Sequence, residues 1–271
     1  MNATGRGELR LTVQGRRWRT RYRAPLFVNV LPAADGTLLA LPVDQGGGLR
    51  NGERQLQRVL LDHGAEVTWA PPASALCLPA SDAAGAHLQL VADVRGASFL
   101  RLAGRPLIPY AGADVVQTTV VAIADGSQCL LLESGCPGRT QMGESWAFTR
   151  LAYRLAVLHR HTVVYRERWE LRPPEVPHAA SGFDGKLGWA TCVACGPQPL
   201  AELEEIRRWL TANGAMVRYG SLGADLAVAR ILDPQGALVT GLADRVLHEA
   251  ERTAANRQPA PEPRRLETTV R

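Results

Sequence analysis

Apolar and polar residues alternate along much of this chain, in short segments that glycine or proline separates. Alternation with a period of two is typical of strands that bury one face of a sheet. The clearest such segments are Leu9 to Val13, Leu88 to Val94, Phe148 to Leu158 and Tyr165 to Leu171. Two near-continuous apolar runs, Val115 to Ile123 and Cys129 to Leu132, predict strands that are buried on both faces. We therefore expect a mainly β protein with stacked or closed sheets.

Only two segments show the pattern of a helix. The first begins after Pro197 and stops at Gly214. The second starts at Asp233, a capping residue followed by proline, and continues to about Arg252. The expected apolar faces are Leu203, Ile206 and Leu210 in the first helix and Leu238, Leu242 and Val246 in the second. Between the helices we expect two strands, Ala215 to Gly220 and Leu226 to Leu232.

At 271 residues the chain is long enough for one large β domain. We expect that domain to cover residues 1–253, with its helical end at about 198–253. The stretch from Arg172 to Gly188, rich in proline and glycine, predicts a linker or a long excursion before this end. Residues 254–271 are rich in proline, arginine and glutamate, so we expect them to be disordered on their own.

The chain shows neither a membrane span nor a secretory signal. No run approaches the roughly eighteen apolar residues that a span requires. The first residues, Met1 to Arg10, mix glycine with charge and lack the apolar centre of a signal peptide. The five cysteines are an odd number, which fits reduced thiols better than a disulfide framework. These features predict a cytoplasmic protein.

The net charge of +5 comes almost wholly from arginine, because Lys186 is the only lysine. Arginine forks suit fixed, bidentate contacts to carboxylates, so one interpretation is a surface that complements an acidic protein partner. Simple solubility explains the charge equally well. Aromatic residues are few and are not interleaved with basic ones, which argues against a nucleic-acid partner.

No arrangement of residues indicates catalysis. A Gly-x-Ser-x-Gly nucleophile elbow is absent, since Leu132 stands where the first glycine before Ser134 would be. The glycine run from Gly46 to Gly52 lacks the lysine and the hydroxyl residue with which a P-loop holds phosphate and magnesium. We therefore predict a protein that is not an enzyme and does not bind a nucleotide.

Metal ligation is the sharper chemical hypothesis. Cys192 and Cys195 form a Cys-x-x-Cys, a spacing that can hold zinc or nickel from a turn. There is no second such motif and the segment is also typical of a buried strand, so inert core thiols are the favoured interpretation. His159 and His161 share a face if the chain is extended, but they fall at an expected hairpin tip and solvation explains them equally well. Cys136 lies in a glycine-rich turn, where a soft thiolate would suit a transient metal ligand.

Two glycine-containing segments carry a recognisable pattern. The first is a turn followed by two long strands, with the motif residues Gly138, Arg139, Gly143, Glu144, Arg166, Glu167 and Arg168. The second is the glycine run, with Gly47, Gly48 and the acid Glu53. Together these residues resemble the motifs of the urease accessory protein family called UreD or UreH. The likeness covers most of the chain at low identity, so the chain looks like a divergent member.

The resemblance implies a fold and a function. The implied fold is a single domain of stacked, β-helix-like strands with two helices near the C-terminus. The implied function is that of a non-catalytic maturation scaffold that helps deliver nickel to an apo-metalloenzyme through a water-filled passage, with nickel bound only transiently and no tightly bound cofactor. The implied partners are a helical urease accessory protein, a nickel-loading GTPase and apo-urease, and the turn and glycine-run residues are the candidate partner-binding positions.

Two segments depart from the family pattern and leave alternatives open. The family has a patch containing Thr and Lys where this chain has Trp69 to Cys77, and a Pro-Gln-Glu where it has Ala103 to Arg105. One alternative is a paralogous assembly factor or subunit for a different metalloenzyme. Another is a small-molecule-binding β domain or enzyme, which predicts a deep polar pocket with a perturbed acid or histidine.

Overall fold

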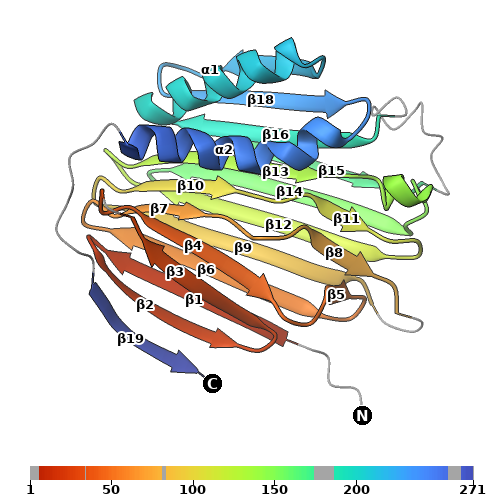
Figure 1. The fold of residues 1–271 in the computed structure, drawn as a ribbon, viewed down its shortest axis with the longest axis horizontal. Helices are drawn as coiled ribbons and strands as arrows, with labels where there is room; N and C mark the ends of the chain where they lie inside the picture. Colours follow the sequence, from red (N-terminus) through yellow and green to blue (C-terminus); the bar gives the residue numbers. More distant parts are fainter. Residues whose placement is uncertain (1–5, 34, 81–83, 174–185, 256–263, 271) are drawn as a thin grey trace.

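The computed structural model describes residues 6–33, 35–80, 84–173, 186–255 and 264–270. Its strands follow one another in successive coils that form two facing sheets, with both helices on the outer face of one sheet (Figure 1). In the central coils, each turn of the chain adds one strand to each sheet, parallel to the strand of the coil before. This arrangement confirms the expected stack of β-helix-like strands with two helices near the C-terminus.

The first sheet, sheet A, has eight strands within the described residues, in the order β15-β14-β12-β9-β6-β1-β2-β19. They are β1 (Arg6–Gln14), β2 (Arg17–Arg23), β6 (Arg54–Asp62), β9 (Ala86–Val94), β12 (Asp114–Ile123), β14 (Arg150–His159), β15 (Thr162–Leu171) and β19 (Arg264–Val270). Five neighbouring strands of this sheet, β14, β12, β9, β6 and β1, run parallel to one another. An antiparallel neighbour flanks them on each side, β2 beside β1 and β15 beside β14.

The second sheet, sheet B, has eleven strands in the part of the chain that the structure describes. Its main path contains β3 (Leu26–Pro32), β4 (Leu38–Asp44), β7 (Glu66–Trp69), β10 (Phe99–Ala103), β13 (Gln128–Gly135), β16 (Gly188–Cys195), β17 (Met216–Ser221) and β18 (Leu226–Asp233). The short strands β5 (Leu49–Arg50), β8 (Ala75–Leu78) and β11 (Leu107–Pro109) form a parallel ladder that joins this path at β13. The two strands expected between the helices are β17 and β18.

The two helices lie where the sequence predicts them. Helix α1 (Pro197–Ala212) buries Leu203, Ile206 and Leu210 completely. Helix α2 (Ala237–Ala255) begins later than expected because Asp233 still belongs to β18. The carboxylate of Asp233 nevertheless caps this helix, since its Oδ2 accepts hydrogen bonds from the backbone N–H groups of Leu238 at 2.8 Å and Val239 at 3.2 Å. Among the described residues, no helix combines the length and hydropathy needed to cross a membrane.

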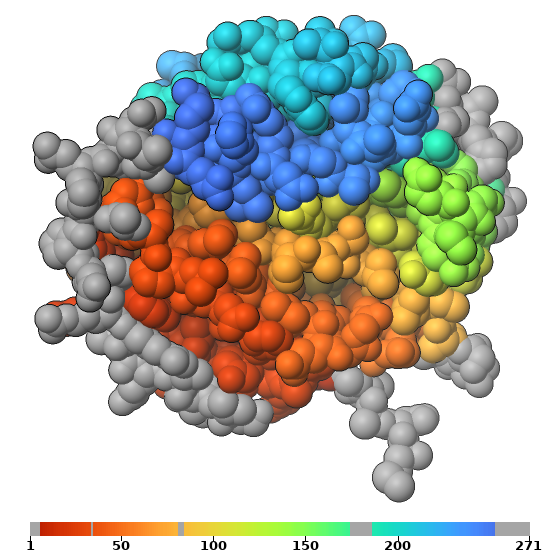
Figure 2. All heavy atoms as spheres, viewed as in Figure 1, coloured from red at the N-terminus to blue at the C-terminus, as the bar shows by residue number. Residues whose placement is uncertain are grey.

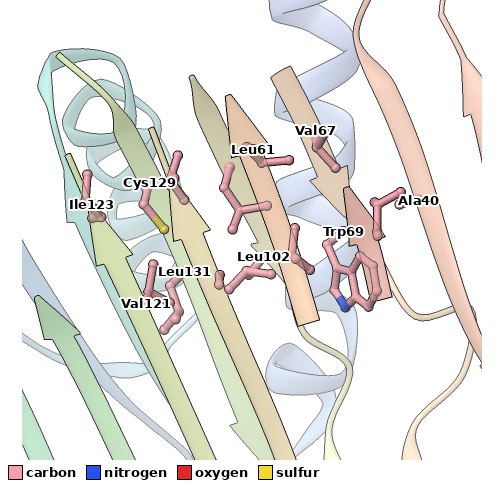
Figure 3. Packing of buried hydrophobic residues seen from close by; sticks show 14 of the residues in the cluster. Ala40, Leu61, Val67, Trp69, Leu102, Val121, Ile123, Cys129 and Leu131 are labelled. Carbon is pink, nitrogen blue, oxygen red and sulfur yellow. The ribbon is translucent and has the colours of Figure 1, made fainter. Parts of the chain in front are cut away.

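Apolar side chains fill the space between the sheets and the space between sheet B and the helices. In the inter-sheet layer, Val121 and Ile123 of sheet A lie near Leu102 and Leu131 of sheet B (Figure 3). Because sheet B is covered on both faces, the predicted run Cys129 to Leu132 is buried on both sides, as expected. The same prediction is wrong for part of β12, whose outward positions are partly exposed because nothing covers the outer face of sheet A there among the described residues.

Two further expectations about the chain path are wrong in detail. The alternating segments Phe148 to Leu158 and Tyr165 to Leu171 predict a turn at His159 and Arg160, but the turn consists of Arg160 and His161, with φ of 51° and 64°, and His159 still belongs to β14. For residues 264–270 the expectation of a disordered tail is wrong, since they form β19 and pair in parallel with β2. Pairing at a sheet edge uses main-chain hydrogen bonds and does not depend on apolar side chains. Residues 174–185 of the expected linker and 256–263 of the expected tail lie outside the described residues.

Candidate functional site

The turn with the first motif is a tight bend after β13. Gly138 has φ of +136°, and a Cβ at this position would lie 2.7 Å from the carbonyl oxygen of Glu144. The bend continues through a short 3-10 helix, Thr140–Met142, that ends at Gly143 with φ of +72°. The side chains of Arg139 and Glu144 form an ion pair across the bend.

The glycine run forms a second tight loop. Gly47 and Gly48 have φ of +71° and +124°, and a Cβ on Gly48 would lie 3.0 Å from the carbonyl oxygen of Leu76. The glycine therefore lets β5 approach β8. Glu53 accepts a hydrogen bond from the backbone N–H of Arg50 at 2.8 Å and closes the loop.

The structure brings the turn and the glycine run to one segment, residues 110–114, which comprises the loop after β11 and the first residue of β12. Glu144 Oε1 accepts a hydrogen bond from the backbone N–H of Ala111 at 3.0 Å. The guanidinium of Arg139 lies over the ring of Tyr110, 4.5 Å from its centroid. From the other side, Asn51 Oδ1 accepts a hydrogen bond from the backbone N–H of Asp114 at 2.9 Å. The motif residues thus shape a connected surface region, and their direct contact with a partner stays a prediction.

The structure separates the two thiols of the Cys-x-x-Cys. Cys192 packs in the layer between sheet B and the helices, whereas Cys195 packs in the layer between the sheets. Residues three apart in a strand point to opposite faces, so these thiols cannot hold one ion together. The cross-strand neighbour of Cys195 is Cys129, which shares its layer.

The remaining metal candidates differ in position and exposure. Cys136 is buried, and burial raises the pKa of its thiol to about 11, with a further contribution from Asp233. His159 lies at the hairpin tip, with Nε2 3.1 Å from Asp125 Oδ1, and His161 is exposed beside it. Over the described residues, no three His, Cys, Asp or Glu side chains come together as a metal site. Metal contact by Cys136, His159 or His161 stays a prediction.

We expect all five cysteines to resist thiol reagents in the folded protein. Each is buried, and burial raises the pKa of Cys77 and Cys192 to about 12 and that of Cys136 to about 11. Because the thiolate is the reactive form, labelling at neutral pH should be very slow. A colorimetric thiol assay should detect almost no reaction in buffer and all five thiols after unfolding in urea. Rapid labelling of any cysteine before unfolding would show that its site opens to solvent.

A cavity of about 280 Å³ with a mostly apolar wall and a few polar groups lies between the sheets. Gln55 and Gln117 of sheet A and Glu133 of sheet B contribute to its wall. Its rim includes the glycine loop and the segment from Pro71 to Cys77. The face shown in Figure 2 is hollowed where the orange and yellow segments meet below α2. The cavity therefore reaches from the rim of the molecule into the inter-sheet layer.

Several buried polar atoms of this wall lack a hydrogen bond within the described residues, namely Trp69 Nε1, Glu133 Oε2 and Ser134 Oγ. The other oxygen of Glu133 accepts hydrogen bonds from Gln117 Nε2 at 3.0 Å and from the hydroxyl of Thr119. Burial raises the pKa of Glu133 above its usual value, against the opposite effect of Thr119, of the neighbouring hydroxyl of Tyr153 and of Gln117. A buried carboxylate oxygen without a hydrogen-bond partner favours water or a cation in the cavity.

A second buried carboxylate continues this polar layer. Glu167 Oε2 accepts hydrogen bonds from the hydroxyls of Tyr165 at 2.9 Å and Thr191 at 3.0 Å. Arg230, an exposed residue of β18, lies 3.3 Å from its other oxygen. The negative charge of Glu167 repels that of Glu133 and so raises the pKa of Glu133 further. Glu133 lies in the cavity wall, and Glu167 contacts Arg230 at the surface.

Sequence reasoning did not single out these two acids as a site. Glu133 directly follows the apolar run Cys129 to Leu132, and an acid inside a strand buried on both faces is the signal that could have found it. Glu167 belongs to the Arg166-Glu167-Arg168 motif, where it is the one member that points inward. Its burial follows from strand alternation, which places both arginines outside.

Comparison with known proteins identifies the family. The family model described as UreD urease accessory protein matches residues 3–266. The chain is 28% identical to urease accessory protein UreD of Opitutus terrae over 85% of this chain and 84% of the relative. It is 29% identical to the protein of that name from Sorangium cellulosum over 68% of this chain and 60% of the relative. The corresponding figures for urease accessory protein UreD of Brucella suis are 26%, 76% and 75%. This chain therefore belongs to the UreD urease accessory protein family.

Proposed function

We propose that this protein is a non-catalytic maturation scaffold that helps deliver nickel to apo-urease. The observation that carries the proposal is Glu133, a half-buried acid in the wall of the inter-sheet cavity whose Oε2 is buried without a hydrogen-bond partner among the described residues. Family membership supports this function, and the cavity is the proposed route by which nickel passes through the protein. Nickel is the cargo of this process and is bound only in transit.

The chemistry of the cavity wall suits a cation that must be released again. Carboxylate, amide and hydroxyl oxygens line it, for example Glu133, Gln117 and Thr119. Such ligands hold nickel more weakly than a set of thiolates would, so the ion is not trapped. A cation beside Glu133 also favours the ionised carboxylate and opposes the effect of burial on its pKa. Binding of nickel would therefore promote loss of the proton from the Glu133 carboxyl group.

The proposed partners are a helical urease accessory protein, a nickel-loading GTPase and apo-urease. The segment at residues 110–114 is a candidate docking region, because Arg139 and Glu144 contact it from one side and Asn51 from the other. Three segments distant in sequence thus stiffen one surface region. A preorganised surface loses less conformational entropy when a partner binds.

Glu133→Gln tests the proposal. We expect the variant to form the complex with its partners but to lower nickel transfer by about tenfold, since the loss of even a group that supports a metal ligand typically lowers metal affinity by about 10–100-fold. A raised pKa in the folded state means that Glu133 costs stability once the pH exceeds its unfolded pKa, so the amide should not lower the melting temperature. The measurements are the nickel content of apo-urease co-produced with the accessory proteins, complex formation on a sizing column and thermal melting.

Glu170→Gln provides the matched control for this test. Glu170 is an outward acid of β15 that pairs with Arg172, so its loss should leave nickel transfer unchanged. Normal nickel loading by the Glu133 variant would contradict a role for the cavity. Failure of both variants to form the complex would instead locate the defect in docking.

One observation favours a different client enzyme. Both segments that depart from the family pattern line the cavity, through Pro71 to Cys77 in one and Gly104 and Arg105 in the other. A paralogous assembly factor would have its altered residues at such a place. Recovery of another metalloenzyme, without urease, in a pull-down from the native host would support this alternative.

The cavity also meets the expectation for a small-molecule-binding domain, because it has polar groups in its wall and contains an acid of perturbed pKa. That alternative predicts that a small ligand co-purifies with the protein and depends on Glu133. Mass spectrometry of the small molecules released from the unfolded protein distinguishes it from a passage for nickel.

A further inference from the structure

The outward face of sheet A is unusually basic where β2, β1 and β6 lie side by side. Strand β2 alternates buried Trp18 and Thr20 with exposed arginines, so every outward position of this strand is an arginine. Arg10 of β1 and Arg58 of β6 are exposed on the same face. We call this set the arginine ladder, and its members are Arg10, Arg17, Arg19, Arg21, Arg23 and Arg58.

The strand register places like charges directly opposite one another. Arg10 is the cross-strand neighbour of Arg21 on one side and of Arg58 on the other. Like charges in directly opposed positions destabilise a sheet. Within the described residues, none of these three arginines has an ion pair. These three arginines therefore form no ion pair that would offset their repulsion, whereas Arg23 of the ladder has Glu8 as its cross-strand neighbour.

Some arginines elsewhere on the chain pair with acids. Arg105 pairs with Asp244 and Arg150 pairs with Asp114, in both cases between separate elements. Arg154 of β14 and Arg168 of β15 are also exposed and opposed, but as a single pair, whereas the ladder extends across three neighbouring strands. A row of mutually repelling guanidinium groups is complementary to an anionic surface.

The surface of the ladder has room for acidic groups between the guanidinium forks. A depression of about 280 Å³ is lined by Arg10, Arg17, Arg19 and Arg21 together with Thr12 and Gln14. A smaller one of about 140 Å³ beside it is lined by Arg10, Arg21 and Arg23 together with Glu8 and with Tyr22, which packs against the core. Each guanidinium presents a planar fork that matches a carboxylate in a bidentate manner.

We propose that the arginine ladder docks a carboxylate-rich surface of a folded protein partner. A protein is favoured over nucleic acid because the outward positions of β1, β2 and β6 include no aromatic residue on which bases could stack. The half-buried Leu56 and Leu60 lie on the same face and supply apolar contact area of the kind that protein interfaces use. Strands β1 and β2 lie at the opposite end of the molecule from α1 (Figure 1), so this surface is separate from the helical end.

Binding of an acidic probe to the full-length chain tests the proposal without nickel or urease. The probe is a fluorescein-labelled oligoglutamate peptide, followed by fluorescence anisotropy at low and at high salt. We expect Arg10→Ser/Arg21→Ser to weaken binding by about tenfold and to reduce its salt dependence. Its melting temperature should be unchanged or higher, because a like-charge pair is removed.

A matched control removes the same two charges elsewhere. Arg208→Ser/Arg218→Ser changes α1 and β17, and we expect it to keep the affinity for oligoglutamate within about twofold. Equal weakening in both double variants would overturn the proposal, since net charge alone would then explain binding. A lower melting temperature of the Arg10/Arg21 variant would also overturn it, because the ladder would then have a structural role. The same conclusion follows if an oligothymidylate binds as tightly as oligoglutamate and with the same dependence on the ladder.

Discussion

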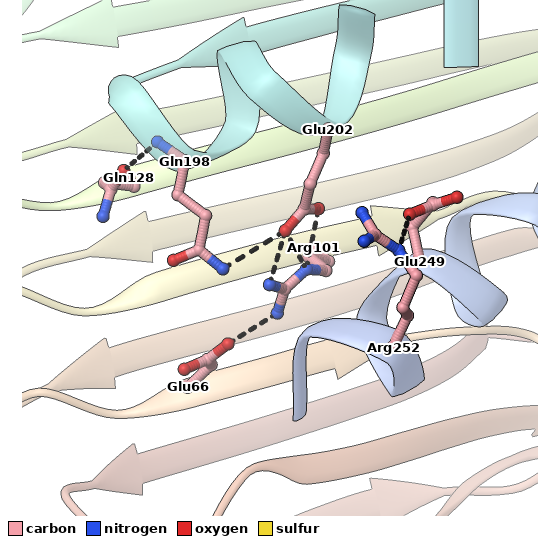
Figure 4. A network of polar contacts seen from close by, with 7 residues as sticks. All are labelled: Glu66, Arg101, Gln128, Gln198, Glu202, Glu249 and Arg252. Carbon is pink, nitrogen blue, oxygen red and sulfur yellow. Dashed lines mark hydrogen bonds and ion pairs between the residues drawn. The ribbon is translucent and has the colours of Figure 1, made fainter. Parts of the chain in front are cut away.

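Replacement of Arg101 by methionine is expected to lower the free energy of unfolding by about 3–5 kcal/mol. Arg101 of β10 is only 2% exposed and lies between two acids (Figure 4). Its Nε and Nη2 donate to the carboxylate of Glu202 on α1, at 2.9 Å and 2.7 Å, and its Nη1 donates to Glu66 of β7 at 2.7 Å. Methionine would fill much of the volume but leave both carboxylates without their cation.

The size of this effect follows from burial of the partners. Glu202 has a side chain only 6% exposed and Glu66 one 18% exposed, so water cannot replace the lost guanidinium well. Burial by itself lowers the pKa of Arg101, but the hydrogen bonds and charges of Glu202 and Glu66 outweigh it and raise the pKa. Arg101 therefore stays protonated, and its removal leaves unpaired negative charges buried between sheet B and α1.

Urea denaturation of Arg101→Met measures the effect, with Arg105→Met as control. Arg105 pairs with Asp244, whose side chain is 62% exposed, so water can solvate the acid when the arginine is lost. We expect the control to lose no more than about 1 kcal/mol. Adding Glu202→Gln to Arg101→Met should recover part of the loss, because one stranded charge is then removed. Equal stability of the two single variants would show that α1 is held by its apolar face alone.

The helices were predictable because their signals are local. Leu203, Ile206 and Leu210 recur at helical spacing and are all buried on α1. Asp233 was expected as a cap and acts as one, although its place at the end of β18 delays the start of α2. Such signals need only the spacing of residues within one element. The stacking of coils is different, since the strand partners Arg54, His87, Val116 and Ala152 are unevenly spaced in sequence.

The candidate site depends on which strands become neighbours, so the sequence pattern predicted it poorly. The Cys-x-x-Cys spacing suggested a metal clasp, but strand alternation sends Cys192 and Cys195 into different layers. Glu133 and Glu167 become related only when β15 and β13 face each other across the inter-sheet layer. The amino-acid composition shows that the chain is rich in arginine. Only the strand register, which places Arg10 beside Arg21, shows that several of these arginines form one ladder.

Gly135→Ala is expected to lower the free energy of unfolding by about 1–3 kcal/mol. A Cβ at this position would lie 2.2 Å from Cζ2 of Trp189, which is the cross-strand neighbour of Gly135 and is buried. The indole cannot move freely, because its ring meets Trp169 edge-on at 5.7 Å and Trp169 stacks on Tyr153 at 4.9 Å. The added methyl group must therefore displace a row of aromatic rings.

Gly220→Ala is the matched control, since Gly220 is also a strand glycine, but among the described residues no atom lies within 4 Å of the place that its Cβ would take. We expect its free energy of unfolding to change by no more than about 0.5 kcal/mol. Urea denaturation compares the two variants, and near-ultraviolet circular dichroism reports the aromatic row, which should change only for Gly135→Ala. Because Tyr153 lies beside Glu133 at the end of this row, the same substitution should also disturb the polar layer of the cavity. An unchanged aromatic signal in a destabilised Gly135→Ala would mean that the backbone of β13, and not the tryptophan, yields to the methyl group.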